Sequence, residues 1–337
     1  MNWRLNKNMF NKKSILITGG TGSFGKEWVR HILKKYKSIR RLVIFSRDEL
    51  KQYEMEKEFN LKKYPCIRYF IGDVRDSERL TTALRDIDYV IHAAALKQVP
   101  TAEYNPIEYI KTNVIGAQNI VEACAQNKDV KKIIALSTDK ASSPINLYGA
   151  TKLCSDKLFI AANNFTGSNK FTVIRYGNVA GSRGSVIPFF LSQKKTGLIT
   201  ITDKRMTRFN ITLEESVNLV LSSIINSIGG EIIIPKLKSY KILDLAMAIC
   251  NNCKIKFVGK RPGEKLNEEM IASDDSSIKV DMGKFYMLVP PYKIKLFSKK
   301  IKKFKGRILP QNFEYKSGQK EFLNTKELIQ IIKKIKV

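Results

Sequence analysis

The sequence predicts an α/β protein built on a doubly wound parallel sheet, followed by a smaller mixed C-terminal region. Three observations predict this class. Short apolar runs alternate with longer amphipathic stretches as far as residue 175, and a glycine-rich octet, Thr18-Gly-Gly-Thr-Gly-Ser-Phe-Gly25, directly follows the first run. After Tyr176 the alternation loosens, and Gly, Ser and Pro gather in residues 177–188.

The alternating part divides into candidate strands and helices. Its apolar runs are short and rich in β-branched residues, as buried parallel strands are. They cover residues 14–18, 41–45, 67–71, 89–92, 132–136 and 171–175. Apolar residues at helical spacing predict helices between them, over 24–36, 50–59, 106–126 and 147–165.

Length and composition bound the possible functions. The chain has 337 residues, enough for two coupled parts, and neither repeats nor long linkers separate them. Its net charge of +29 is compatible with a nucleic-acid or membrane partner. However, Lys, Ile and Asn are abundant throughout, which indicates a compositional bias spread over solvated faces. We expect no nucleic-acid partner, although the basic run 293–307 could form an amphipathic surface segment.

No apolar segment is long enough for a signal peptide or a membrane span, so we expect a cytoplasmic protein. Five cysteines without regular spacing then predict reduced thiols. Cys250 and Cys253 form a C-x-x-C pair, but the two histidines lie far away in the sequence, so we expect no metal.

The octet 18–25 has the context of a phosphate-binding turn, because a strand precedes it and a helix follows. Gly19 and Gly22 would let the backbone approach a pyrophosphate, and Gly25 would let helix and strand pack closely. We group Thr21, Ser23 and Phe24 with them. The alternative is a plain glycine-rich turn. The G-x-x-G-x-x-G spacing resembles the extended short-chain dehydrogenase/reductase family.

The second strand ends in a pair suited to NADP. The hydroxyl of Ser46 and the guanidinium of Arg47 fit a ribose 2′-phosphate, whereas an NAD site usually places a carboxylate there. Asp48 would reach the ribose of NAD after a small backbone shift, so NAD stays open; Lys51 is included in this site. The resemblance implies cofactor contacts from Asp73, Val74, Ala93, Ala94 and Lys97, whereas His92 is expected to be structural.

Tyr148 and Lys152 lie on one face of a predicted helix, where an ammonium group would lower the pKa of the phenol and hold the nicotinamide ribose. Tyr53 and Lys57 have the same spacing in a solvent-facing helix, so spacing alone does not decide. Position favours Tyr148, because Ser137 and Thr138 end the preceding strand and complete the family's Ser/Thr, Tyr and Lys set.

Asp139 and Lys140 follow Thr138, where epimerases of this family usually have small residues. A dehydratase needs an acid for the departing hydroxyl and a base for the proton beside a carbonyl, and this pair supplies both. Lys140 needs a lowered pKa for that role. We expect desolvation and the charges of Lys152 and Lys97 to lower it, with Asp139 opposing them. A surface ion pair is the alternative.

Four segments carry a more specific resemblance: STDKASSPINLYGATKLCSDKLF, RYGNVAGSRGSVIPFF, DKRMTRF and RPGEKLNEEM. Over residues 14–270 the chain is similar to the inverting UDP-N-acetylglucosamine 4,6-dehydratases, which begin pseudaminic acid synthesis. One departure is Asn267, where close relatives commonly have His. The resemblance implies sugar contacts from Thr138, Asp139, Lys140 and Tyr148, substrate contacts from Lys97 and Asn178, and UDP contacts from Arg208, Arg261 and Glu264.

The expected protein is thus an NADP-dependent UDP-N-acetylglucosamine 4,6-dehydratase, a hydro-lyase that inverts sugar carbon 5. We expect an NADP-binding Rossmann domain over 1–176 and a substrate-binding region over 177–337, with part of 211–235 packing back on the first. Relatives imply a dimer or a hexamer. The alternatives are a UDP-sugar 4-epimerase and a non-catalytic NADP-binding Rossmann protein.

Overall fold

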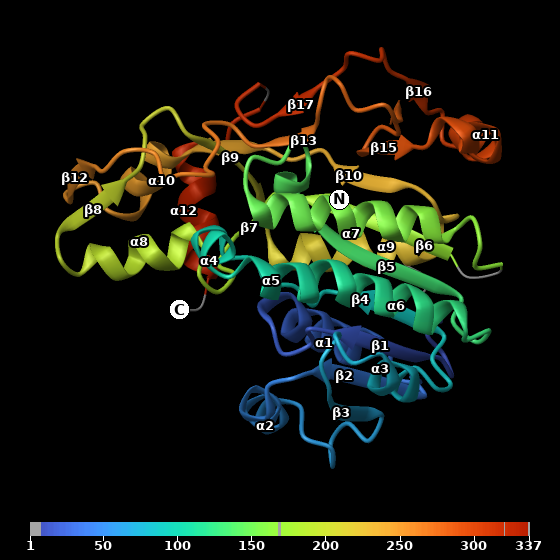
Figure 1. The fold of residues 1–337 in the computed structure, drawn as a ribbon. Coiled ribbons are helices and arrows are strands. Elements are labelled where there is room, and N and C mark those ends of the chain that lie inside the picture. Colours follow the sequence, from blue (N-terminus) through green and yellow to red (C-terminus); the bar gives the residue numbers. More distant parts are fainter. Residues whose placement is uncertain (1–7, 168–169, 320, 336–337) are drawn as a thin grey trace.

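The computed structural model describes residues 8–167, 170–319 and 321–335. A parallel sheet forms the centre of the molecule (Figure 1). Its strands are β1 (Ser14–Thr18), β2 (Arg41–Ser46), β3 (Ile67–Ile71), β4 (Tyr89–His92), β5 (Lys132–Thr138), β6 (Lys170–Tyr176) and β10 (Ile232–Pro235). They pair in the order β10-β6-β5-β4-β1-β2-β3. The predicted doubly wound parallel sheet is confirmed, and β5 and β6 extend beyond their predicted ends to Thr138 and Tyr176.

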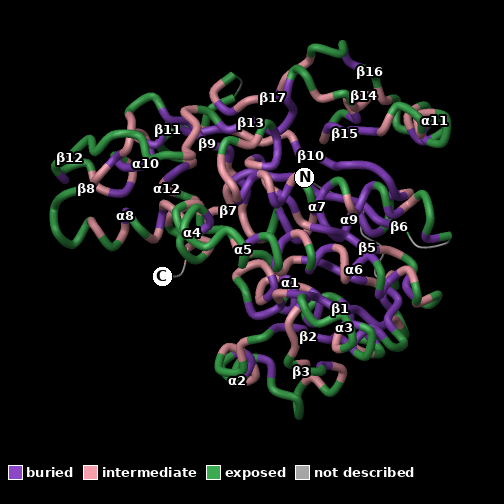
Figure 2. The backbone as a smooth tube through the Cα atoms, viewed as in Figure 1, coloured by how far each residue is buried: buried purple, intermediate pink, exposed green. Residues whose placement is uncertain are grey.

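Helices cover both faces of the sheet. They are α1 (Ser23–Lys35), α2 (Glu49–Glu58), α3 (Ser77–Ala83), α4 (Val99–Tyr104), α5 (Pro106–Tyr109), the π-helix η1 (Ile110–Ile115), α6 (Gly116–Ala125), the 3₁₀ turn η2 (Asp139–Ala141), α7 (Leu147–Ala162) and α9 (Leu213–Asn226). Ile15 and Ile17 of β1 pack with the side of α1 and α9, whereas Leu16 packs with the side of α3, α6 and α7. Figure 2 shows this buried centre.

The predicted helix 106–126 is interrupted. It consists of α5, η1 and α6, because a π-helical turn replaces the regular helix between Ile110 and Ile115. The short helices α3 and α4 were not predicted, since their sequences are too short to show helical periodicity.

Residues after 176 serve two places in the fold. One group forms a lobe at the end of the sheet, with its own apolar core. This group contains β7 (Asn178–Val179), α8 (Val186–Lys194), β8 (Leu198–Ile201), β9 (Thr207–Ile211), β11 (Ser239–Lys241), α10 (Ile242–Ile249), β12 (Lys254–Phe257) and α12 (Thr325–Lys334). The paired strands β13 (Glu269–Ile271) and β17 (Tyr315–Lys316) pack instead on the core of the main sheet.

The other group returns to the main sheet. Helix α9 packs on α1, and β10 pairs with β6. Beyond β10 the sheet continues in antiparallel strands, which the sequence reading did not anticipate. These strands are β15 (Phe285–Val289), β14 (Ile278–Asp281) and β16 (Arg307–Ile308), accompanied by η3 (Pro291–Lys293) and α11 (Ile294–Lys303).

One expectation about the cysteines is wrong. Cys250 and Cys253 form a disulfide. The turn that follows α10 brings their Cα atoms to 5.5 Å, within the range a disulfide can span. The described part of the chain contains no group of three or more His, Cys, Asp or Glu side chains arranged to hold a metal ion.

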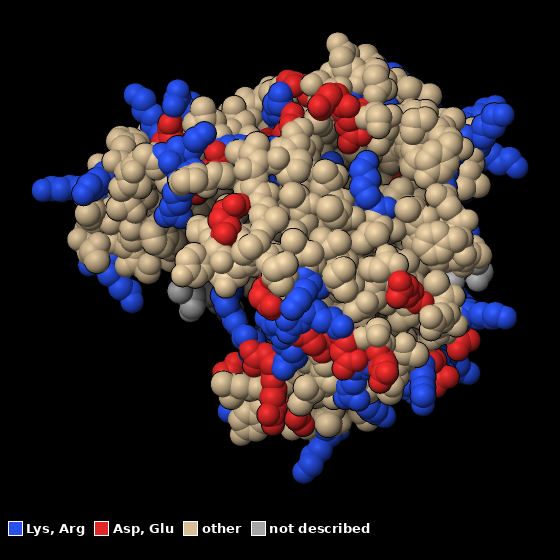
Figure 3. Space-filling view, viewed as in Figure 1, with Lys and Arg blue, Asp and Glu red and all other residues tan. Residues whose placement is uncertain are grey.

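The surface charge is dispersed on the face shown in Figure 3, where Lys and Arg side chains project at separate places and acidic side chains lie between several of them. Across the described residues, every helix falls short of the length and apolarity that spanning a membrane requires.

Candidate active site

A cavity of about 1130 Å³ lies at the carboxyl ends of the parallel strands, between the sheet and the C-terminal lobe. Every site residue singled out from the sequence lines it. These residues are Gly19, Thr21, Gly22, Ser23, Phe24, Gly25, Ser46, Arg47, Asp48, Lys51, Asp73, Val74, Ala93, Ala94, Lys97, Thr138, Asp139, Lys140, Tyr148, Lys152, Asn178, Arg208, Arg261 and Glu264.

The turn after β1 has the geometry of a phosphate site. Gly19 has a φ of +65°, and a Cβ there would lie 2.8 Å from the backbone nitrogen of Ala94. At Gly25 a Cβ would collide with the backbone of Gly20, so glycine allows α1 to pack against the turn. Because α1 begins at Ser23, its free N–H groups face the cavity and can bind an anion.

His92 contacts Thr18, at the start of this turn, and does not line the cavity. The hydroxyl of Thr18 accepts hydrogen bonds from the backbone nitrogens of Ala93 and Ala94, both at 3.2 Å. Its hydrogen is therefore available to Nδ1 of His92, 2.9 Å away. Burial lowers the pKa of His92 to about 3, so the ring is neutral.

At the end of β2, the guanidinium of Arg47 is accessible. Its side chain is 54% exposed and lies 3.7 Å from the carboxylate of Asp73. Asp48, in contrast, caps α2: its carboxylate accepts the backbone N–H of Lys51 at 2.9 Å and also pairs with the Lys51 ammonium. The hydroxyl of Ser46 accepts a hydrogen bond from Gln52. Asp48 is thus held on its own helix.

Asn113 was missed by the sequence reading. It lies in η1 and is buried, and its side-chain amide exchanges two 2.9 Å hydrogen bonds with the backbone of Leu96. It also donates to the hydroxyl of Thr151 in α7. Asn113 therefore joins the loop that carries Lys97 to the helix that carries Tyr148. The π-helical turn is the structural feature that marks it, because such turns are frequent at functional sites.

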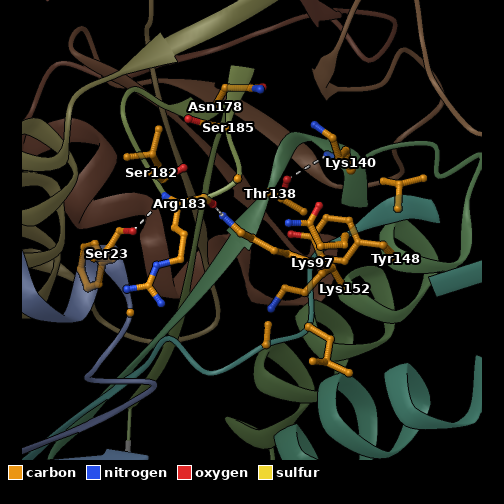
Figure 4. Close-up of a pocket in the computed structure, with 18 of the residues that line it drawn as sticks. Ser23, Lys97, Thr138, Lys140, Tyr148, Lys152, Asn178, Ser182, Arg183 and Ser185 are labelled. Atoms are coloured by element: carbon orange, nitrogen blue, oxygen red, sulfur yellow. Dashed lines mark hydrogen bonds between the residues drawn. The ribbon is translucent and has the colours of Figure 1, made fainter. Parts of the chain in front are cut away.

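Two local devices bring Lys140 beside Tyr148. The side chain of Asn146 caps α7 by accepting the N–H of Gly149 at 2.8 Å. Gly149 in turn lets the carbonyl of Lys140 approach α7, because a Cβ there would collide with that oxygen. Figure 4 shows Lys140, Tyr148 and Lys152 on the same side of the pocket. The backbone N–H of Lys140 donates a hydrogen bond to the hydroxyl of Thr138.

The environment of Lys140 differs from the expected one. Its Nζ atom lies 3.1 Å from Oδ1 of Asp139 and 3.1 Å from Oε1 of Glu268. Burial alone would lower the pKa of Lys140, but the two carboxylates outweigh burial and raise it. The expected lowering is therefore wrong for this arrangement, because Glu268 adds a second negative charge from a distant segment.

Asp139 is the carboxyl group of the cluster whose pKa is raised. Burial raises its pKa and the charge of Glu268 adds to that effect, against the opposing charge of Lys140. Its Oδ1 accepts a hydrogen bond from the hydroxyl of Thr138 at 3.0 Å. Its Oδ2 is buried and without a hydrogen-bond partner among the residues described. A protonated carboxyl at this position can donate to a group in the cavity.

Tyr148 and Lys152 are both buried. Burial raises the pKa of Tyr148 to about 12, and the charge that opposes burial most is that of Lys140 rather than the expected Lys152. Burial lowers the pKa of Lys152, while Asp156 one turn further along α7 opposes that shift. The four-residue spacing predicted that Lys152 would act on Tyr148 from the same helix face. The charge that acts on Tyr148 is instead that of Lys140 in the neighbouring turn η2.

The substrate side of the cavity has one buried acceptor without a partner, a buried arginine and an exposed arginine. Oδ1 of Asn178 is buried and makes no hydrogen bond within the described structure. Arg208 is buried, donates to the carbonyls of Thr207 and Leu266, and lies 3.5 Å from Glu268. Arg261 also lines the cavity but is exposed, and its backbone N–H donates to the carboxylate of Glu264.

Asn267 does not line the cavity, and its side chain accepts a hydrogen bond from the hydroxyl of Thr207 at 2.7 Å. Glu268, directly after it, was also missed by the sequence reading. The only available signal was its place at the end of the RPGEKLNEEM segment. Nothing in the sequence indicates that this carboxylate meets Lys140.

Comparison with known proteins agrees with this geometry. A family model described as polysaccharide biosynthesis protein matches residues 15–290. The chain belongs to this family. A UDP-N-acetylglucosamine 4,6-dehydratase (inverting) of Campylobacter jejuni is 55% identical over 333 residues, which cover 96% of this chain and 98% of the relative. A UDP-glucose 4-epimerase of Rickettsia bellii is 45% identical and covers 83% and 84% of the two chains.

The fold is likewise that of a solved family structure. The X-ray structure of Pen from Bacillus thuringiensis superposes with a TM-score of 0.85 at 36% identity, covering 96% of this chain and 98% of that one. The agreement extends through the C-terminal lobe and the antiparallel strands of the sheet, because it covers nearly the whole chain.

Proposed function

We propose that this protein is an inverting UDP-N-acetylglucosamine 4,6-dehydratase, a hydro-lyase. The observation that carries the proposal is the buried Asp139–Lys140 pair beside Tyr148 in a cavity large enough for a dinucleotide and a nucleotide sugar. A simple epimerase needs a base for the 4-hydroxyl but no second acid–base pair. The dehydratase of Campylobacter jejuni, at 55% identity, supports the same reaction.

The residues fit a nicotinamide dinucleotide. The backbone from Gly19 to Gly25 and the N-terminus of α1 would hold its pyrophosphate, and Lys152 its nicotinamide ribose. We assign NADP, because Arg47 is exposed at the end of β2 while Asp48 is occupied as the cap of α2. When bound, this cofactor supplies hydride acceptance from sugar carbon 4 and hydride return to carbon 6.

The protein's own residues move the protons. Tyr148 accepts the proton of the 4-hydroxyl, which leaves a ketone at carbon 4 and makes the carbon 5 proton acidic. Lys140 first loses its ammonium proton to solvent; its free amine then accepts the carbon 5 proton, and the electron pair of the C–H bond passes into the enolate. Asp139 donates a proton to the 6-hydroxyl, which leaves as water. Carbon 5 then takes a solvent-derived proton from the opposite face, which gives the inverted 4-keto-6-deoxy sugar.

The remaining residues position the substrate. Asn178 offers its free Oδ1 to a donor on the substrate. Arg208 and Arg261 carry the charge a diphosphate needs, and Glu264 accepts from the uracil N–H. We assign residues 1–176 to cofactor binding and 177–337 to substrate binding, with part of 211–235 packing on the first part.

One experiment tests the reaction. The purified protein is incubated with UDP-N-acetylglucosamine in deuterated water and the sugar is followed by proton NMR. We expect a 4-keto-6-deoxy product carrying deuterium at carbon 5. A carbon 4 epimer without deuterium at carbon 5 would establish the epimerase, which the Rickettsia relatives favour. No turnover of any UDP-sugar, together with salt-sensitive nucleic-acid binding, would indicate a non-catalytic protein.

A further inference from the structure

Glu268 lies at the base of the cavity and contacts two cations from different parts of the chain. Its Oε1 is 3.1 Å from Nζ of Lys140 and 3.5 Å from Nε of Arg208. The side chain is only 4% exposed, and Oε2 has no hydrogen-bond partner in the described residues. A carboxylate this deeply buried is costly unless cations pair with it, so Glu268 and Lys140 stabilise each other's charged forms.

The backbone of Glu268 is fixed independently of these ion pairs. Its N–H donates to the hydroxyl of Ser317 at 2.8 Å, and its carbonyl accepts the N–H of Ser317 at 2.8 Å. The Ser317 hydroxyl lies 2.8 Å from the hydroxyl of Thr207, next to Arg208. The backbone that carries the Glu268 carboxylate is therefore fixed by hydrogen bonds to Ser317. This segment is far from η2 in the sequence, and its carboxylate contacts Lys140.

Several other charged or titratable groups surround Lys140, and they differ in sign. Asp139 pairs with it directly, Arg208 opposes its charge, and Lys97 and Lys265 act as further nearby cations. The phenols of Tyr148 and Tyr240 also face it. Among these groups only Asp139 and Glu268 have carboxyl side chains, and Asp139 must be protonated to act as the acid of the proposed reaction. Glu268 is thus the carboxylate that can keep its negative charge beside Lys140.

We propose that Glu268 is a positioning residue for the dehydration. It holds the ammonium form of Lys140 in place in the cavity before Lys140 loses its proton and acts as the base at carbon 5. The catalytic part of this inference rests on the proposed function. The placement of Lys140 does not, because it depends only on the ion pair.

Two measurements test the inference. Competitive acetylation of Lys140, quantified by mass spectrometry across pH, reports where its amine loses the proton without requiring activity. The pH profile of kcat with UDP-N-acetylglucosamine reports the same group in turnover. For Glu268→Gln we expect the labelling midpoint to move about one pH unit or more to lower pH, because a negative charge is lost near the ammonium group. The limb of the kcat profile that reports Lys140 should move in the same direction.

Matched variants separate this effect from damage to the fold. Glu269→Gln is the control, because Glu269 is also buried but pairs with Lys316 outside the cavity. It should leave both midpoints unchanged. Glu268→Asp keeps the charge with a shorter reach, so it should keep the labelling midpoint near that of the natural protein while lowering kcat. This variant remains informative if the Gln variant does not fold.

Three results would overturn the inference. The first two are an unchanged labelling midpoint in Glu268→Gln and a loss of kcat that is uniform at every pH. A shift of similar size in Glu269→Gln also overturns it. If the natural protein forms no 4-keto-6-deoxy sugar, the proposed function and the catalytic part of the inference fail together, while the labelling midpoint still decides whether Glu268 holds the Lys140 ammonium.

Discussion

Gly149 of α7 faces the carbonyl oxygen of Lys140 so closely that no Cβ fits between them. This contact seats the turn η2 on the helix that carries Tyr148. Alanine at position 149 would favour the helix by about 1 kcal/mol on propensity alone, yet it must push η2 away. The structure therefore places the distance between Lys140 and Tyr148 under the control of one glycine.

For Gly149→Ala we expect kcat to fall by roughly 100-fold, because displacing a reacting group by about 1 Å has an effect of that order. Steady-state kinetics with UDP-N-acetylglucosamine measures it. Ala161→Gly, at an exposed position of the same helix, is the control and should lower the melting temperature without changing kcat. Full activity in Gly149→Ala would show that the close contact is unimportant.

Arg47 should decide between the two dinucleotides. Arg47→Ala is expected to weaken NADP binding by about 10- to 100-fold and to leave NAD binding nearly unchanged, because only NADP carries the phosphate that the guanidinium contacts. Isothermal titration calorimetry measures both affinities. Arg30→Ala is a suitable control, since Arg30 does not line the cavity and pairs with Glu27 and Glu58. Equal losses for both cofactors would argue against the assignment of NADP.

Asp139→Asn should separate proton exchange from water loss. Asparagine cannot donate the acid proton, so we expect formation of the 4-keto-6-deoxy product to fall by about 10²- to 10⁴-fold. Carbon 5 of the recovered substrate should still exchange with deuterium, as seen by NMR. Asp129→Asn, at an exposed loop position, should behave like the natural protein. Product formation at an unchanged rate would remove Asp139 from the mechanism.

The raised pKa of Asp139 also predicts a pH dependence. A carboxyl that acts as an acid is active only while protonated, and burial keeps Asp139 protonated to higher pH than an ordinary aspartate. The rate of water loss should therefore decline as pH rises through this raised pKa. A single-turnover measurement of product formation across pH checks the direction. A rate that rises monotonically with pH would contradict it.

His92 should make the fold sensitive to acid. The unfolded chain binds a proton at this residue below about pH 6.5, whereas the folded protein does not until about pH 3, so stability is lost as pH falls between these values. Between about pH 6.5 and about pH 5 the loss should be roughly 2 kcal/mol. Urea unfolding at both pH values measures it. His92→Gln should remove that part of the loss, and His31→Gln should remove less.

Much of the fold was predictable because its signals are local. Alternation of apolar runs identified each strand from β1 to β6, and the octet 18–25 identified the phosphate turn. The break of the predicted helix 106–126 was not visible, because a π-helical turn uses the same residues as a regular helix and differs only in hydrogen bonding. Cys250 and Cys253 were recognised as a C-x-x-C pair but expected to be reduced, because the chain shows no export signal; the turn after α10 brings them together as a disulfide.

By itself the sequence determined which chemical groups gather at the edge of the sheet, because the ends of parallel strands meet there whatever the rest of the chain does. Tertiary structure alone decided the protonation of those groups. Lys140 was expected to have a lowered pKa. Its pKa is raised instead, because the carboxylate of Glu268, in a segment far along the sequence, lies beside its ammonium group. Charges act through space, so a group distant in sequence can reverse what the neighbouring residues predict.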